Sequence, residues 1–225
     1  MKYLSICLLF ISVYAQGQYK FIDNTSSGQY EAKIFVANCE KSSCDGKGII
    51  ILYNKISGAE IQTFHSVNLE FSLTDKQDAK LGWLPLGKYQ SPLIFGDFNF
   101  DGFEDIAIRN GSKGSYDSPS YDVYVATVNA KFSLDARLTA LASQNLGMFA
   151  LDKKNQWIST EEKNGCCYLK TTRYKQDHKK QWLVVETVIE DSSIGEDVLV
   201  ITQKLINGKI QKTVEKFKIK DYYTN

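Results

Sequence analysis

Short apolar runs recur at regular intervals through the last third of the chain, and this pattern most constrains the fold. Turn-forming segments rich in Asn, Asp, Gly and Ser separate the runs, which cover residues 148–151, 157–160, 167–174, 182–189, 198–206 and 209–219. Short apolar runs bounded by turn residues are typical of strands. Asn207-Gly208 between the last two runs favours a type I′ hairpin turn. We therefore expect an all-β fold, an antiparallel meander of many short strands arranged as a sandwich or in a propeller-like way.

The first part of the chain shows the same strand periods. Residues 67–73 alternate between apolar and polar side chains, as a half-buried strand does. Further strands are expected at residues 19–22, 31–37, 48–53, 61–64 and 121–128. Leucines recur at helical spacing only in residues 133–143. No repeat period is present, which disfavours a full propeller, and residues 16–225 are expected to form one all-β domain or two sub-domains divided near residue 90.

The N-terminus has the pattern of a secretion signal. Lys2 supplies the positive start, residues 3–14 are apolar, and the sequence up to Ala15 fits a signal-peptidase site, so residues 1–15 are the expected signal peptide. Ile6 precedes Cys7 where a lipoprotein signal requires a small residue, so lipidation is not expected. No later run is long and apolar enough to cross a bilayer. The mature protein is expected in the periplasm of a bacterium or outside the cell.

Charge and cysteine content narrow the class of partner and the compartment. The chain has 27 basic and 26 acidic residues, a balance that argues against nucleic acid as a partner. Near the C-terminus six lysines form a stripe that is more typical of a protected edge strand than of a binding surface: Lys204, Lys209, Lys212, Lys216, Lys218 and Lys220. Outside the signal the cysteine count is even, which favours disulfides in an exported protein.

Spacing leaves the pairing of these cysteines open. Cys39 and Cys44 enclose a loop small enough to close at the end of a hairpin, and this pairing is favoured. Cys166 and Cys167 then remain for each other, and Gly165 could supply the turn that such neighbours need, since adjacent residues of a strand point to opposite faces. The alternative is that each of this pair bonds to Cys39 or Cys44.

One dense chemical signal lies between two predicted strands, at residues 93–109. Five oxygen sources fall within it at spacings that let a curled chain surround one ion: Asp97, Asn99, Asp101, the Phe103 carbonyl and Asp105. Calcium takes six to eight oxygen ligands, and alternate side chains of such a loop point inward. Gly102 is expected to turn the backbone sharply with a positive φ. The sequence thus predicts one calcium loop between strands.

This loop has two alternative interpretations. An EF-hand loop requires a glutamate at its twelfth position, which here is Ile108, so the EF-hand hypothesis fails. The remaining alternative is a solvated turn without metal. Three converging carboxylates would repel one another without a cation, which favours the metal-bound form.

The segment after the calcium loop is the best candidate for contact with a partner. Residues 110–120 are rich in Gly and Ser, lack an apolar period and are expected to form an exposed loop. Tyrosines cluster near it, and exposed tyrosines in such loops are used in protein recognition. The expected partner-binding residues are Ser112, Lys113, Ser115, Tyr116 and Tyr121.

Candidates for catalysis are few. The only histidines, His65 and His178, have no neighbour at metal-ligand spacing and are expected at the surface. The carboxylates of the Asp97 loop could pair for glycoside hydrolysis, but the calcium hypothesis already accounts for them. We therefore expect that the protein is not an enzyme.

Three sequence features together resemble one protein family. They are the signal peptide, the segment G-D-F-N-F-D-G-F-E-D-I-A-I with the following N-G-S-K-G-S-Y-D-S-P-S-Y-D-V-Y, and the later N-G-C-C-Y-L. This combination resembles periplasmic single-FG-GAP proteins, which are similar to the immunity proteins against peptidoglycan-degrading effectors of the Xanthomonas type IV secretion system. That group in turn resembles periplasmic inhibitors of invertebrate-type lysozymes, which plug an active-site cleft with a loop. The absence of a lipobox is a departure from the immunity proteins.

Two functional hypotheses follow. The resemblance implies an immunity protein or inhibitor whose partner is a lysozyme-like peptidoglycan hydrolase and whose 110–120 loop enters the active site. The loop leaves the calcium site directly and is held at its other end by the strand of Tyr121, so it would lose little entropy on binding. The alternative is a calcium-stabilised binding or adhesion module that contacts glycan or a surface protein.

Overall fold

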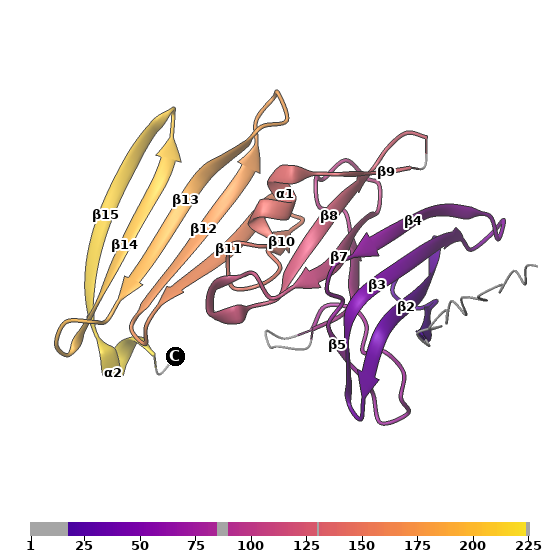
Figure 1. Ribbon diagram of the computed structural model, residues 1–225. Coiled ribbons are helices and arrows are strands. Elements are labelled where there is room, and N and C mark those ends of the chain that lie inside the picture. Colours follow the sequence, from indigo (N-terminus) through magenta and orange to yellow (C-terminus); the bar gives the residue numbers. More distant parts are fainter. Residues whose placement is uncertain (1–17, 85–89, 130, 224–225) are drawn as a thin grey trace, which may run out of the picture.

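The computed structural model describes residues 18–84, 90–129 and 131–223 of the chain. Three antiparallel sheets follow one another across the molecule in sequence order, from the indigo N-terminal sheet to the yellow C-terminal sheet (Figure 1). The all-β prediction is confirmed, while the predicted signal peptide lies outside the described residues. None of the helices in the described ranges has the length and apolar character needed to cross a bilayer.

Five strands form the first sheet, in the order β1-β2-β3-β4 with β5 paired to β3. Their bounds are β1 (Tyr19–Asp23), β2 (Tyr30–Glu40), β3 (Ser43–Asn54), β4 (Glu60–Ser66) and β5 (Phe71–Ser72). The strand predicted at residues 67–73 is therefore too long. Its alternation was still informative, because Leu69, Phe71 and Leu73 are buried as the pattern predicted, whereas Val67 is exposed.

Four strands form the second sheet, in sequence order. They are β6 (Leu93–Gly96), β7 (Asp105–Gly111), β8 (Ser120–Ala126) and β9 (Phe132–Leu134). A 3₁₀ turn, η1 (Ser115–Asp117), lies between β7 and β8, and helix α1 (Ala136–Leu141) follows β9. Helix α1 falls inside the predicted helical segment, and Asp135 caps its start by accepting from the Leu138 amide at 2.8 Å.

The third sheet is the predicted meander, with six strands in sequence order. They are β10 (Ala150–Asp152), β11 (Trp157–Asn164), β12 (Tyr168–Gln176), β13 (Trp182–Asp191), β14 (Asp197–Ile206) and β15 (Lys209–Lys218), followed by helix α2 (Ile219–Tyr222). Asn207 and Gly208 both have positive φ, as the predicted type I′ turn requires. Strand β15 forms the edge of the sheet, and all of its residues are exposed.

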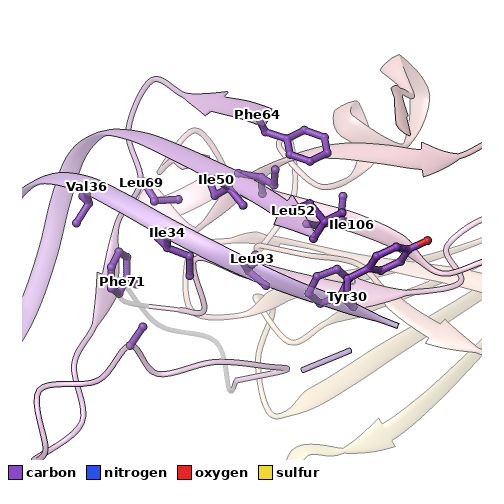
Figure 2. Close-up of a cluster of buried hydrophobic side chains, with 14 of the residues drawn as sticks. Tyr30, Ile34, Val36, Ile50, Leu52, Phe64, Leu69, Phe71, Leu93 and Ile106 are labelled. Carbon is purple, nitrogen blue, oxygen red and sulfur yellow. The ribbon is translucent and has the colours of Figure 1, made fainter. Parts of the chain in front are cut away.

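Two apolar cores place the second sheet in the middle of the molecule. The first core joins the first and second sheets: Ile34 and Ile50 pack with Leu93 and Ile106, as Figure 2 shows. The second core lies on the opposite face of the second sheet, where α1 and the start of the third sheet cover it. The first two sheets thus form a sandwich, and β7 is buried along its whole length.

Both favoured disulfides are present. Cys39 and Cys44 face each other across the β2–β3 hairpin and are bonded, with Cα atoms 4.0 Å apart. Cys166 and Cys167 are bonded to each other in the turn between β11 and β12. The pairing favoured from loop size is confirmed, and the alternative of crossed bonds is excluded.

Candidate functional site

The loop between β6 and β7 is shaped by hydrogen bonds in which its own side chains accept from its backbone amides. The two carboxylate oxygens of Asp97 accept from the amides of Asp101 and Gly102, each at 3.0 Å. Asn99 Oδ1 also accepts from the Asp101 amide at 3.1 Å, and Asp101 Oδ1 accepts from the Phe103 amide at 2.9 Å. Gly102 has φ of 89°, which confirms the predicted sharp turn. The polar residues of the motif therefore curl the loop as expected.

Asp105 lies behind this loop and connects it to the neighbouring strand. Its side chain is fully buried and accepts from the Phe98 and Ala126 amides, both at 2.8 Å. Burial raises the pKa of Asp105 to about 7, the two backbone hydrogen bonds oppose that shift, and the charges of Asp101 and Asp97 add to it. A cation in the loop would favour the ionised form of this carboxyl, because opposite charge lowers a carboxyl pKa.

The chemistry of this loop fits a hard cation. The side-chain atoms available as metal ligands are oxygens, the ligand type that calcium prefers. Each carboxylate oxygen that accepts a hydrogen bond from one amide retains a second lone pair for a metal ion. Within the described ranges, no three carboxylate, imidazole or thiol groups converge as a ready-made metal centre. Asp97 and Asp105 each accept from two backbone amides. Calcium binding by this loop stays a prediction.

The second loop of interest spans residues 112–119 and leaves the opposite end of β7. It is shorter than predicted, because β7 extends to Gly111 and β8 begins at Ser120. The side chain of buried Asn110 closes its base: Asn110 Nδ2 donates to Asp122 Oδ1 at 2.5 Å, and its Oδ1 accepts from Ser120 Oγ at 2.6 Å. Ser120 Oγ also accepts from the Lys113 amide at 3.2 Å. Both strand ends of the loop are therefore fixed.

The middle of this loop rests on the segment that follows α1. The Ser115 amide donates to the Asn145 carbonyl at 3.2 Å, and the side chain of Asn145 in turn donates to the Leu141 carbonyl of α1 at 2.9 Å. A Cβ atom at Gly114 would lie 2.4 Å from the Asn145 carbonyl oxygen, so only glycine permits this close approach. Backbone contacts thus hold the loop on the segment after α1.

Tyr116 connects the tip of the loop to the vicinal disulfide. It adopts a left-handed conformation with φ of 57°, and Asp117 follows with φ of 55°. Tyr116 is 63% exposed, yet its hydroxyl accepts from the Gly165 amide at 2.5 Å. Gly165 immediately precedes the bonded pair of Cys166, which is exposed, and Cys167, which is half-buried. The loop and the β11–β12 turn therefore share one surface.

Ser112 has a supporting position in this loop. Its hydroxyl donates to Glu70 Oε2 at 2.9 Å and accepts from the Arg109 guanidinium at 3.0 Å. Arg109 also pairs with Glu70 at 2.9 Å, and the Arg109 side chain is fully buried. Burial would raise the pKa of Glu70, but hydrogen bonds from Ser112 and Arg109 and the Arg109 charge outweigh it, so that pKa is lowered. Ser112 is half-buried and holds the base of the loop. Lys113 and Tyr116 are exposed, and Ser115 is half-buried.

The prediction that Tyr121 faces a partner is wrong. Its side chain is fully buried, and its hydroxyl donates to the Ser91 carbonyl at 3.0 Å. Burial raises the pKa of Tyr121 to about 12, against the opposing charge of nearby Arg109. The alternation through β8 did not reveal which face of the strand would be covered, and this face belongs to the second core. Tyr121 therefore anchors β8.

Other residues singled out from the sequence are dispersed. His65 and His178 are exposed, as expected. The C-terminal lysines do not form one free stripe, because Lys204 pairs with Glu186, and both Lys216 and Lys218 pair with Asp197, each at 2.9 Å. The contact of Gly165 with Tyr116 was missed from the sequence, since no local signal indicates a hydrogen bond across 49 positions.

Comparison with known proteins establishes only the fold. No protein-family model and no curated protein matches the chain. One solved structure, described as that of a Xanthomonas type IV secretion system related protein, matches with a TM-score of 0.64 and 17% sequence identity. The match covers 89% of this chain and 94% of the other chain. The two chains thus share their architecture over nearly their whole length.

Proposed function

We propose that this chain is a calcium-binding protein of the periplasm, or secreted, that blocks a lysozyme-like peptidoglycan hydrolase by inserting the 112–119 loop in its active site. It would act as an immunity protein or inhibitor. The observation that carries the proposal is the anchoring of this loop, by Asn110 and Ser120 at its base, Asn145 in its middle and Gly165 at its tip. A loop ordered before binding loses less entropy on binding, which is how small inhibitors gain affinity.

The exposed groups of the loop suit a cleft lined with carboxylates. Most glycosidases use two carboxyl groups roughly 5 to 10 Å apart, so an inhibitor benefits from a cation and hydrogen-bond donors at that place. Lys113 is exposed and offers an ammonium group, and the exposed ring of Tyr116 offers apolar contact area. Ser115 adds a hydroxyl beside them. Inhibition of this kind would be stoichiometric and would need no catalytic group on the chain.

Calcium in this proposal has a structural role. The ligands would be Asp97, Asn99, Asp101, the Phe103 carbonyl and Asp105. The Asp105 carboxylate accepts from Ala126 in β8, and β7 runs directly from Asp105 to the base of the inhibitory loop. An ion bound here would stabilise the strand that carries the loop. The shared architecture with a type IV secretion related protein is compatible with a partner delivered by such a system.

Inhibition of cell-wall lysis tests the proposal. The purified mature protein is mixed with a panel of lysozymes and with any hydrolase encoded beside its gene, and lysis of peptidoglycan is followed. Wild-type protein should inhibit one of them, and the double variant Lys113→Ala/Tyr116→Ala should inhibit it far more weakly. A matched control, Tyr19→Ala/Lys76→Ala, removes the same residue types from exposed positions of the first sheet and its flank. Equal inhibition by all three proteins would show that this loop is not the plug.

The same panel separates the alternative hypothesis. An adhesion module would bind purified peptidoglycan or another glycan without slowing any hydrolase. Retention on insoluble peptidoglycan in the absence of inhibition would therefore favour the adhesion module over the inhibitor.

A further inference from the structure

The third sheet brings three turns together at one end. Consecutive strands of a meander run in opposite directions, so alternate turns lie at the same end: those after β10, β12 and β14. Figure 1 shows the β12–β13 and β14–β15 turns both at the top of the sheet. Gln156 of the β10–β11 turn lines a hollow with Lys175 and Lys180. Segments more than 50 residues apart in the sequence thus lie at one end of the sheet.

This end of the sheet is strongly basic. All of its lysines are exposed, and we call the set the basic end: Lys153, Lys154, Lys175, Lys179, Lys180, Lys204 and Lys209. Within this end lie the carboxylates of Asp152, Asp177 and Glu186, and Glu186 is paired with both Lys204 and Arg173. At its border, Asp101 and Asp135 line a hollow with Lys180. The carboxylates of Asp152 and Asp177 accept hydrogen bonds within their own turns. The lysines therefore remain in excess.

The opposite end of the sheet has more acidic groups. The turn after β13 brings Glu190, Asp191, Glu196 and Asp197 together there, and Asp197 pairs with Lys216 and Lys218. A formal net charge of only +1 for the chain conceals this polarity, which exists only once the meander has formed. The calcium loop borders the basic end, since Asn99 and Asp101 share a hollow with Lys180. A bound calcium ion would offset the negative charge of that loop.

Apolar side chains project from the same end. The tip of the β14–β15 hairpin exposes Leu205, Ile206 and Ile210, the last of which is 72% exposed. Lys204 and Lys209 flank these side chains directly. Apolar groups bordered by lysines are the pattern of peripheral membrane contact, because the apolar groups enter the headgroup region while the ammonium groups meet lipid phosphates.

We propose that the basic end docks on the surface of an anionic phospholipid bilayer. A flat bilayer fits three turns at one end of a sheet, and the apolar hairpin tip favours lipid over an acidic protein, which would leave that tip in water. The disulfide turn that contacts Tyr116 lies at the opposite end of the sheet, so docking would turn the 112–119 loop away from the membrane. The proposal does not depend on the inhibitor function.

Vesicle binding of the mature protein tests this proposal. The protein should sediment with vesicles of phosphatidylglycerol and phosphatidylcholine and remain in solution with phosphatidylcholine alone. Binding should weaken between about 0.1 and 0.5 M salt, because salt screens exposed charges. The variant Lys179→Ser/Lys180→Ser/Lys209→Ser should bind roughly tenfold or more weakly. Ile206→Ser/Ile210→Ser should also bind more weakly while keeping its charge.

A charge-matched variant provides the control. Lys20→Ser/Lys47→Ser/Lys76→Ser removes the same charge from exposed positions outside the third sheet and should bind like wild type. The proposal is overturned if the control loses as much binding as the basic-end variant, or if neutral vesicles bind equally well. It is also overturned if the protein does not bind vesicles but binds polyglutamate. That result would indicate that the lysines bind an acidic protein.

Discussion

Strands β7 and β15 have opposite environments. All residues of β7 are buried, because it lies inside the middle sheet with a core on each face. All residues of β15 are exposed, because it pairs only with β14 and lies at the edge of the last sheet. Both strands carry aliphatic side chains, but β15 also carries four lysines, so its composition agrees with its position at the edge.

The two strands therefore differ in role: β7 contributes to stability, whereas β15 contributes exposed surface. Each end of β7 continues into a loop of the candidate site, so the buried strand holds both loops in a fixed relation. Strand β15 supports no buried site, and its side chains are available to partners. Substitutions should therefore reduce stability strongly in β7 and hardly at all in β15, and the following predictions test that contrast.

The largest effect is expected at Arg109 in β7. Arg109→Met should lower the free energy of unfolding by about 3 kcal/mol, since removing one partner of a buried ion pair leaves Glu70 uncompensated. Urea unfolding measures the change. Lys212→Met in β15 is the matched control and should be nearly neutral. Similar losses for the two variants would remove the distinction between the strands.

Calcium should have the next largest effect. Chelation should lower the melting temperature of the wild-type protein, because a ligand that binds only the folded state stabilises it by about 2.7 kcal/mol at a hundredfold excess over Kd. Asp101→Ala should abolish the difference between calcium and EDTA, whereas Asp75→Ala, at another exposed acidic position, should keep it. An unchanged melting temperature in EDTA would show that the β6–β7 loop is a turn without metal.

Acid should weaken the Arg109 pair. The pKa of Glu70 is lowered in the folded protein, so its contribution to stability is present above its ordinary value of 4.5 and is lost as pH falls through the folded pKa. Glu70→Gln should therefore make the unfolding free energy less dependent on pH below about 4.5. Denaturant titrations at several pH values measure this slope. An identical slope in the variant would contradict the assignment.

The smallest effect is expected in β15. Val214 is 56% exposed, so Val214→Thr should change the unfolding free energy by less than about 0.5 kcal/mol. Urea unfolding again provides the measurement. A loss above about 1 kcal/mol would mean that β15 is covered in solution, as it would be in an assembly.

Local patterns predicted much of this fold. The meander and its Asn207-Gly208 turn follow from alternation and turn chemistry, which act between neighbours in the sequence. The curled loop at Asp97 and the Cys39–Cys44 bridge are local for the same reason. These features required no knowledge of how the sheets pack.

Features that depend on packing could not be predicted. The burial of Tyr121 depends on which face of β8 α1 covers, and the end of β7 at Gly111 depends on its pairing with Ser120. The contact of Tyr116 with Gly165 joins two separate sheets. The polarity of the third sheet is another case, since it arises only when alternate turns meet at one end.

Hydrogen exchange on the complex tests directly whether the 112–119 loop contacts the hydrolase. The mature protein is incubated in deuterated buffer with and without an equimolar amount of the hydrolase that it inhibits, and amide protection is mapped along the chain. We expect new amide protection in residues 112–118 and in the 164–167 turn, and we expect unchanged protection in β15. Protection confined to β15, or to any surface that excludes the 112–119 loop, would contradict this contact.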